Sequence, residues 1–427
     1  MRKIKVSIAG LGVVGGGLLS LLVEDRRFTR QGVDFGIAGV SARTRHRDRA
    51  VSIDAYPWFD DPVALATHDD TDIFVELIGG SDGPAKAAVT AALEAGKPVV
   101  TADKALIAEH GPMLAALAEK KGVALKFEAA VAGGTPVIHG IRDGVAACTV
   151  SSVNGILNGT CNYILSTMAE TGASFESVLL DAQREGFAEA DPSFDIDGVD
   201  AAHKLAILAT LAFDAEIAMA DISIRGIRHI QLADVEAAKH QNLAIKLLAE
   251  AVLQDGALGL RVTPALIPER NAFAETRGSQ NVVTVDAEPL GRLAFSGPGA
   301  GAGATASAVA ADLCDLARGG AASPVYATAA EQLRRLPSLS TADMENSYFI
   351  RLSLKDEPGA MATVADALAA ERISIESLRQ PPSHDSTAPV VIVTHPCRAA
   401  AAEAVANTIA AQPFVAEPPS VLPIIIP

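Results

Sequence analysis

An acidic segment, EADPSFDIDGVDAAHK at residues 189–204, ends on a lysine that leads into an apolar run. Lys204 follows Asp200 by four residues, a spacing that places both side chains on one face of a helix. Residues 205–213 are apolar on nearly every face, so we expect the helix to be buried and the lysine to be partly desolvated. A lysine held by a carboxylate could give a proton to the alkoxide that hydride transfer to a carbonyl leaves. The spacing alone slightly favours a simpler interpretation, a helix-start ion pair worth about 0.2–0.5 kcal/mol.

The same segment has the carboxylates of a calcium loop but not its ending. If Gly198 is placed at the sixth position of such a loop, Lys204 falls at the twelfth, where a bidentate glutamate belongs. A lysine cannot ligate a cation, so we reject a calcium-binding loop.

A glycine-rich turn near the N-terminus has the pattern of a dinucleotide-binding site. Residues 6–9 read as a strand, Gly10, Gly12 and Gly15 form G-x-G-x-x-G, and an amphipathic helix follows. The first glycine permits a tight turn, the second lets a pyrophosphate approach the backbone, and the third allows close packing of helix on strand. We therefore expect cofactor contacts from these glycines and from the two residues between the last pair, Val13 and Val14.

The end of the second strand indicates which nicotinamide cofactor is preferred. An NAD site usually has an acidic residue there, whereas this chain has Arg43 and Arg45. Guanidinium groups suit a 2′-phosphate, so we predict NADP(H), with NAD(H) as the alternative. The alternative is that the two arginines are ordinary surface charges.

Composition excludes several other classes. The 427 residues carry a formal charge of -16, and a short basic patch at 43–49 is too small for a nucleic-acid footprint. Four widely spaced cysteines indicate neither disulfides nor zinc and fit a reducing cytoplasm. Residues 6–23 mimic a signal peptide or membrane helix, but their five glycines argue against both. We expect a cytoplasmic protein that binds neither nucleic acid nor membrane.

The order of strand-like and helix-like segments predicts three domains. Residues 1–130 alternate strands and helices, which favours a parallel α/β Rossmann domain. Residues 131–318 mix helices, including 242–253, with strands and predict an α+β domain. Residues 319–346 are predicted to be a linker. Residues 347–427 have the order of a single βαββαβ, ferredoxin-like module.

Over nearly its whole length the chain resembles homoserine dehydrogenase. The most specific matching motifs are FEAAVAGGTPVI at 127–138, GILNGTCNYIL at 155–165 and GFAEADPSFDIDGVDAAHKLAIL at 186–208. The resemblance implies a Rossmann domain for NAD(P)(H) and an α+β domain for the substrate and for dimerisation. It also implies the reversible reduction of L-aspartate 4-semialdehyde to L-homoserine, towards threonine and methionine.

The resemblance gives individual residues their expected roles. Lys204 matches the proposed general acid/base and Asp200 its carboxylate partner. Glu189 matches the residue that recognises the substrate amino group, with Asp195 and Thr160 nearby. This match reverses the preference for a simple helix-start ion pair.

Other implied contacts concern the cofactor and a cation. Lys104 matches a lysine at the junction of nicotinamide and substrate, and Gly301 falls in a segment, 297–318, that returns to the cofactor. A structural monovalent-cation site, expected to hold sodium, is implied at Glu128 and at the backbone carbonyls of Val131, Gly133 and Thr135.

Two residues depart from the family pattern. Asp103 replaces the usual asparagine and adds a negative charge beside Lys104, which could raise the pKa of that lysine. Phe187 stands where the family often has tyrosine, so a hydroxyl contact is lost.

The C-terminal module resembles an ACT domain, which implies feedback by L-threonine in a homodimer or homotetramer. The alternative is a ferredoxin-like dimerisation module without a ligand. Two rival functions remain open: a phosphorylating semialdehyde dehydrogenase, which needs a cysteine nucleophile such as Cys148 or Cys161, and a non-catalytic sensor of NADP and amino acids.

Overall fold

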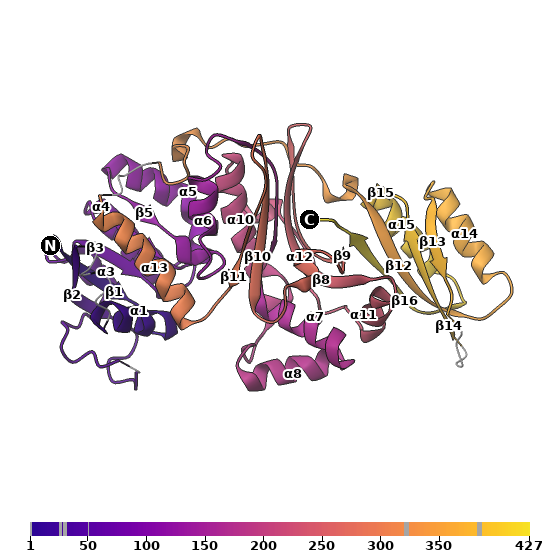
Figure 1. Ribbon diagram of the computed structural model, residues 1–427, viewed down its shortest axis with the longest axis horizontal. Coiled ribbons are helices and arrows are strands. Elements are labelled where there is room, and N and C mark those ends of the chain that lie inside the picture. Colours follow the sequence, from indigo (N-terminus) through magenta and orange to yellow (C-terminus); the bar gives the residue numbers. More distant parts are fainter. Residues whose placement is uncertain (1, 25–27, 29–31, 50, 320–323, 382–386) are drawn as a thin grey trace. The chain divides into compact units, whose positions relative to one another are not determined.

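The computed structural model describes residues 2–24, 28, 32–49, 51–319, 324–381 and 387–427 (Figure 1). Residues 320–323 of the predicted linker therefore lie outside the described residues. The chain forms two compact units. The first comprises Met1–Leu157, Asp200–Ile222 and Ser279–Leu336, and the second comprises Asn158–Val199, Ser223–Gly278 and Pro337–Pro427.

A five-stranded parallel sheet forms the centre of the first unit. Its strand order is β2-β1-β3-β4-β5. All four pairings are parallel, as the alternation of strands and helices predicts. The strands are β1 (Arg2–Ala9), β2 (Val33–Ser41), β3 (Ile73–Glu76), β4 (Val99–Thr101) and β5 (Leu125–Lys126).

Helices cover this sheet and complete a Rossmann-like domain. Helix α13 packs against α1, so a segment from late in the chain joins the N-terminal core (Figure 1). Helix α13 lies within the return segment predicted at 297–318. The helices are α1 (Val13–Glu24), α3 (Pro62–Thr67), α4 (Pro84–Glu94), α5 (Lys104–Lys121) and α13 (Ala302–Ala317).

The first unit also contains three antiparallel strands and two further helices. Strand β10 (Gln280–Glu288) pairs with β6 (Thr149–Ile156) on one side and β11 (Gly291–Pro298) on the other. Helix α6 (Val137–Arg142) follows the short 3-10 turn η1 (Glu128–Ala130). Helix α10 (Val199–Phe213) is buried along nearly all of its length, as its apolar sequence predicts. Two short 3-10 turns, η2 (Met219–Asp221) and η3 (Ala330–Gln332), complete the unit.

In the second unit, one expected helix is a strand. The prediction of a helix at 242–253 was wrong, because this segment forms β8 (Leu243–Gln254), paired antiparallel with β9 (Ala257–Pro268). Its leucines, alanines, lysine and glutamate are good helix formers, and burial on both faces removes the alternation that marks a strand. Cross-strand pairs hold it instead, such as Glu250 with Arg261 at 2.5 Å.

Helices surround this hairpin. Helix α7 packs against α8, α11 and β8. The remaining elements of this part are α7 (Gly159–Thr171), α8 (Phe175–Glu185), α9 (Ser193–Ile196), β7 (Ser223–Ile224), α11 (Leu232–Lys239) and α12 (Ala272–Glu275).

The C-terminal part of the second unit has the expected βαββαβ order. Its strands follow the order β16-β12-β14-β13, and α14 and α15 share one core with them. Arg351, on the central strand, is buried and pairs with Asp234 of α11 at 2.6 Å. The elements are η4 (Thr341–Asp343), β12 (Glu345–Lys355), α14 (Ala360–Ala370), β13 (Ile375–Arg379), β14 (Thr387–Thr394), β15 (Cys397–Arg398), α15 (Ala399–Ala410) and β16 (Val415–Ile424).

Candidate functional site

The glycine turn after β1 is closed on one side and open on the other. A Cβ atom on Gly10, whose φ is +98°, would lie 2.2 Å from the backbone of Leu77, and a Cβ on Gly15 would lie 1.9 Å from the carbonyl oxygen of Gly10. These two positions therefore need glycine for packing. A Cβ on Gly12 would meet no atom within 4 Å, so this glycine borders open space at the start of α1.

This difference predicts opposite effects for two alanine substitutions. Gly15→Ala should lower the melting temperature, because the added methyl group overlaps the Gly10 carbonyl. Gly12→Ala should leave the melting temperature nearly unchanged but weaken cofactor binding, because its methyl group projects where a pyrophosphate would approach. Thermal melts with and without NADPH measure both effects. Equal losses of stability in the two variants would contradict the prediction.

The other predicted cofactor residues lie on α1, after β2 and at the start of α13. Val13 is exposed at the start of α1, and Arg43 is exposed just beyond β2. The guanidinium of Arg45 lies 5.9 Å from the ring centre of Trp58, so part of its role is to cover that ring. Gly301, with φ at +113°, is the N-cap of α13. A Cβ on Gly17 of α1 would lie 3.2 Å from the carbonyl of Ala302, so the start of α13 lies against α1.

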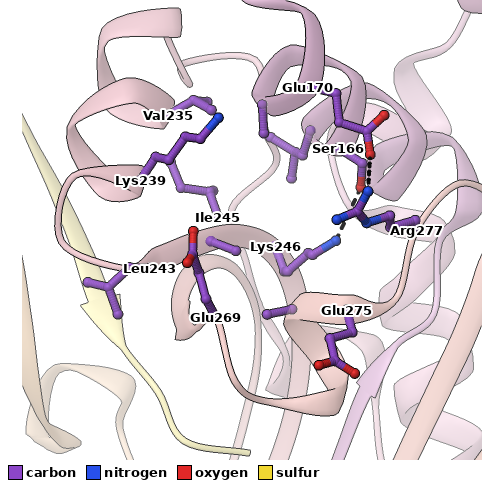
Figure 2. A pocket seen from close by; sticks show the side chains of 14 residues that line it. Ser166, Glu170, Val235, Lys239, Leu243, Ile245, Lys246, Glu269, Glu275 and Arg277 are labelled. Atoms are coloured by element: carbon purple, nitrogen blue, oxygen red, sulfur yellow. Dashed lines mark hydrogen bonds and ion pairs between the residues drawn. The ribbon is translucent and has the colours of Figure 1, made fainter.

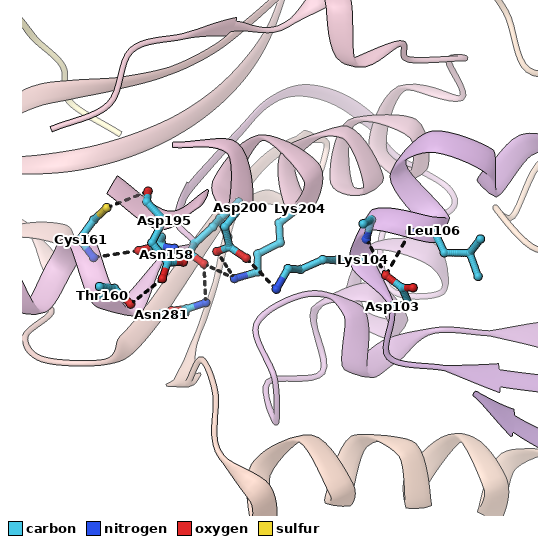
Figure 3. Close-up of polar contacts among 12 residues, drawn as sticks. Asp103, Lys104, Leu106, Asn158, Thr160, Cys161, Asp195, Asp200, Lys204 and Asn281 are labelled. Carbon is cyan, nitrogen blue, oxygen red and sulfur yellow. Dashed lines mark hydrogen bonds and ion pairs between the residues drawn. The ribbon is translucent and has the colours of Figure 1, made fainter. Parts of the chain in front are cut away.

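One carboxylate joins two lysines in the first unit (Figure 3). Asp200 accepts from Lys204 Nζ at 2.7 Å through Oδ2, and its Oδ1 lies 2.8 Å from Lys104 Nζ. Lys204 also donates to the carbonyl of Leu157 at 2.6 Å. Asp200 is 3% and Lys204 9% exposed. The predicted pair is therefore present and buried, and Lys104 joins it.

The two lysines determine the charge of Asp200. Burial alone would raise its pKa, but the attraction of Lys204 and then of Lys104 lowers the pKa of Asp200 well below its usual range. Asp200 is thus ionised at every pH at which the protein would be assayed. It cannot serve as the acid of this group, and it instead holds two ammonium groups in place.

Asp103 has a local structural task beside this group. Its side chain caps α5 by accepting the N–H groups of Ala105 at 3.0 Å and Leu106 at 3.1 Å. Burial raises the pKa of Asp103. Asparagine caps helices equally well, so the departure from the family pattern keeps the cap of the helix that begins at Lys104.

A second polar group surrounds Asp195 in the second unit (Figure 3). Asn158 caps α7, accepting Cys161 N–H at 2.8 Å, and donates to Asp195 Oδ1 at 2.7 Å. Thr160 donates to Asp195 Oδ2 at 3.2 Å and to the carbonyl of Phe187 at 2.9 Å. The structure thus brings the predicted Thr160 and Asp195 together. Asn158 is an additional member that the sequence analysis missed, although its motif, GILNGT, was recognised.

The rest of the acidic segment divides into distinct roles. Glu189 is exposed, and its backbone carbonyl accepts from Gln183. Asp197 pairs with Arg228 on the surface, whereas Asp191 accepts the N–H of Ser193 at 3.1 Å in a turn. Phe187 stacks on Tyr163 with ring centres 4.6 Å apart, so this departure from the family pattern makes an apolar contact.

The carboxylate of Glu128, one of the predicted cation ligands, already has hydrogen-bond partners from the protein. Its carboxylate accepts the N–H groups of Ile138 at 3.0 Å and His139 at 2.8 Å, and it pairs with the His139 ring. Thr135 Oγ1 is buried without a hydrogen-bond partner among the described residues. The described residues contain no cluster of three or more His, Cys, Asp or Glu side chains that could hold a metal. Backbone carbonyls would therefore have to supply most of the ligands.

The cysteines provide little support for a thiol nucleophile. Cys161 is buried, and its Sγ donates to the carbonyl of Asp195 at 3.2 Å. All four cysteines are free thiols within the described chain. Among the described residues, no helix combines the length and apolar character that crossing a membrane requires.

Comparison with known families matches nearly every part of the chain. Residues 136–314 match homoserine dehydrogenase, 10–128 match the NAD-binding domain of homoserine dehydrogenase, and 348–414 match the ACT domain. The homoserine dehydrogenase of Neisseria gonorrhoeae is 40% identical over 92% of this chain and 92% of its own length. That of Corynebacterium glutamicum is 38% identical over 91% of this chain and 88% of its own.

Solved structures give the same result. The crystal structure of a homoserine dehydrogenase from Thiobacillus denitrificans has a TM-score of 0.91 and 37% identity, covering 100% of this chain and 99% of that one. A hyperthermophilic archaeal homoserine dehydrogenase in complex with NADPH has a TM-score of 0.64 and 26% identity, covering 74% and 98%. The chain therefore belongs to the homoserine dehydrogenase family, a family of NAD(P)-dependent oxidoreductases that act on a CH–OH group.

Proposed function

We propose that the chain catalyses the reversible, NAD(P)H-dependent reduction of L-aspartate 4-semialdehyde to L-homoserine, with Lys204 as proton donor. The observation that carries the proton-donor role is the buried Lys204–Asp200 contact at 2.7 Å. The nicotinamide supplies a hydride to the aldehyde carbon when it is bound. The carbonyl oxygen then gains negative charge and needs a proton.

Lys204 has a proton available for this purpose. Two of its three N–H donors are directed to Asp200 and to the carbonyl of Leu157, which leaves one for a substrate oxygen. Asp200 stays ionised and fixes the ammonium group in place. In the reverse direction the neutral lysine takes up the hydroxyl proton of homoserine.

The polar group around Asp195 supports a role in substrate binding. Thr160 and Asn158 orient the Asp195 carboxylate through hydrogen bonds at 3.2 and 2.7 Å. We assign recognition of the substrate amino group to Glu189, with Asp195 and Thr160 contributing. Lys104 is assigned to the junction of nicotinamide and substrate. The assay that tests the reaction follows NADPH oxidation with aspartate 4-semialdehyde and identifies homoserine as the product.

For the cofactor we propose a preference for NADP(H) that depends on Arg43, whose exposed side chain follows β2. Arg43→Ala should raise KM for NADPH roughly tenfold while leaving KM for NADH unchanged, because only NADPH carries the 2′-phosphate. Steady-state assays with both cofactors measure this. Arg47→Ala, from the same basic patch, is the matched control. An unchanged KM for NADPH in Arg43→Ala would remove Arg43 from the site.

For regulation we propose that the ACT domain, matched at 348–414, binds L-threonine as an inhibitor. Activity should fall across millimolar-scale threonine in the full chain, because binding to one state of the protein shifts its population. Constant activity over that range, together with no heat of threonine binding in calorimetry, would contradict this proposal.

Three further assignments are also proposals. The domain boundaries stay at 130, 318 and 346, and the protein is expected to be a homodimer or homotetramer. A sodium ion would be held structurally by Glu128 and by the carbonyls of Val131, Gly133 and Thr135. The buried hydroxyl of Thr135 has no hydrogen-bond partner among the described residues, which supports a polar ligand at this position.

The two rival functions have less support. A phosphorylating semialdehyde dehydrogenase needs an activated thiol, but Cys161 donates its proton to a backbone carbonyl. Phosphate-dependent product formation would decide for that rival. A non-catalytic sensor would bind NADPH without turnover, and the same assay detects this outcome.

A further inference from the structure

Lys246 is a buried charge of the second unit that lies outside the proposed active-site groups. It lies on β8, is 3% exposed, and lines a cavity of about 590 Å³ between α7, α11, β8 and α12 (Figure 2). A buried ammonium group is costly unless every donor is matched. We therefore expect each N–H group of Lys246 to have a hydrogen-bond acceptor.

Every N–H donor of Lys246 has such a partner. Nζ donates to Asn162 Oδ1 at 2.9 Å, to Ser166 Oγ at 3.2 Å and to the carbonyl of Thr276 at 2.6 Å. Asn162 and Ser166 are one turn apart on α7, so a single ammonium group is bound to two successive turns of that helix.

The same network extends to the segment after α12. The amide of Asn162 donates to the carbonyls of Thr276 at 3.2 Å and Gly278 at 2.9 Å. Lys246 and Asn162 thus share the Thr276 carbonyl. Together they fix the position of α7 along its axis relative to β8 and to the 276–278 segment.

The first turn of α7 carries the groups that orient Asp195. Asn158 caps the helix and Thr160 lies in its first turn, and both donate to the Asp195 carboxylate. A helix moves as a rigid body, so a displacement at Asn162 and Ser166 also displaces these two side chains. We infer that Lys246 is a positioning residue for substrate binding, acting through α7 on Thr160 and Asp195. This inference rests on the proposed substrate role of those two residues.

The electrostatic surroundings leave Lys246 charged at neutral pH. Burial, and then repulsion by Arg277, lowers the pKa of Lys246 to about 8, while Glu170 opposes the shift. Lys239, Glu269 and Glu275 are the other charged groups that line the cavity. At neutral pH Lys246 is therefore mostly protonated and supplies all three hydrogen bonds.

The test is Lys246→Met, which keeps the length and the apolar stem of the side chain but removes the three donors. KM for the semialdehyde should rise roughly tenfold or more, whereas KM for NADPH and kcat should stay within about twofold. General destabilisation would not raise one KM selectively. Ser166→Ala, which removes one of the three bonds, should give a smaller change of the same kind if Lys246→Met fails to fold.

Two further variants make the result decisive. Lys239→Met changes an exposed lysine that lines the same cavity and should leave both KM values unchanged. Thr160→Val tests the proposed substrate role directly and should raise KM for the semialdehyde. If Thr160→Val raises this KM but Lys246→Met and Ser166→Ala do not, the inference is overturned. If Thr160→Val has no effect, the substrate role itself is wrong, and the role of Lys246 fails with it.

Discussion

Replacing Lys204 with alanine should lower kcat for semialdehyde reduction roughly 10²- to 10⁴-fold, the usual contribution of a positioned general acid. The substitution removes a buried donor that an ionised carboxylate holds and that has one N–H left after its bonds to Asp200 and Leu157. The fold should persist, because Asp200 keeps its contact with Lys104 at 2.8 Å. Cofactor affinity should be nearly unchanged.

The chain offers a matched control for this variant. Asp82 and Lys86 have the same i,i+4 spacing and lie 3.2 Å apart, but Asp82 is largely exposed. Lys86→Ala removes a lysine from such a pair and should leave kcat unchanged. A near-normal kcat in Lys204→Ala would show that the buried pair of Asp200 and Lys204 only stabilises the helix and has no catalytic role.

The second large effect is expected from Asp200→Asn. The amide has nearly the same shape, but it leaves two ammonium groups without their shared counter-charge in a buried site. Breaking a buried ion pair in this way typically costs about 3–5 kcal/mol of folding free energy. The variant should therefore melt at a clearly lower temperature and also lose kcat, because Lys204 is no longer held in place.

The pH dependence of the lost stability distinguishes the effect of the missing charge from any effect of the changed side-chain shape. Lowering the pH below the usual pKa of an aspartate should reduce the stability deficit of Asp200→Asn. The folded-state pKa of Asp200 is lowered, so the stability that its carboxylate contributes is lost as the pH falls through that pKa. Asp82→Asn is the matched exposed control and should leave the stability nearly unchanged. A deficit of Asp200→Asn that is small and independent of pH would contradict the central role assigned to this carboxylate.

The local part of the site could be predicted from the sequence. The spacing of Asp200 and Lys204, followed by an apolar helix, was sufficient to predict a buried pair, because both side chains belong to one helix with a regular period. The glycine turn was predictable for the same reason. Its strand, glycines and helix are consecutive, and each glycine has a separate steric requirement.

Contacts between distant segments could not be predicted in this way. Lys104 joins Asp200 from a helix about a hundred residues earlier in the chain, and no periodicity links the two. The capping role of Asp103 was missed because the residue was considered only as a charge beside Lys104. Strand β8 was mistaken for a helix because its residues favour helices and its burial on both faces is a tertiary property. The three partners of Lys246 became visible only with that strand in place.

The most direct test of the central claim compares kcat in Lys204→Ala and Lys104→Ala under saturating NADPH and semialdehyde. If Lys204 is the proton donor, its variant loses roughly 100-fold or more in kcat, whereas Lys104→Ala mainly raises KM. If the order is reversed, or if Lys204→Ala keeps more than about a tenth of wild-type kcat, the proton comes from another group and the proposed mechanism is wrong.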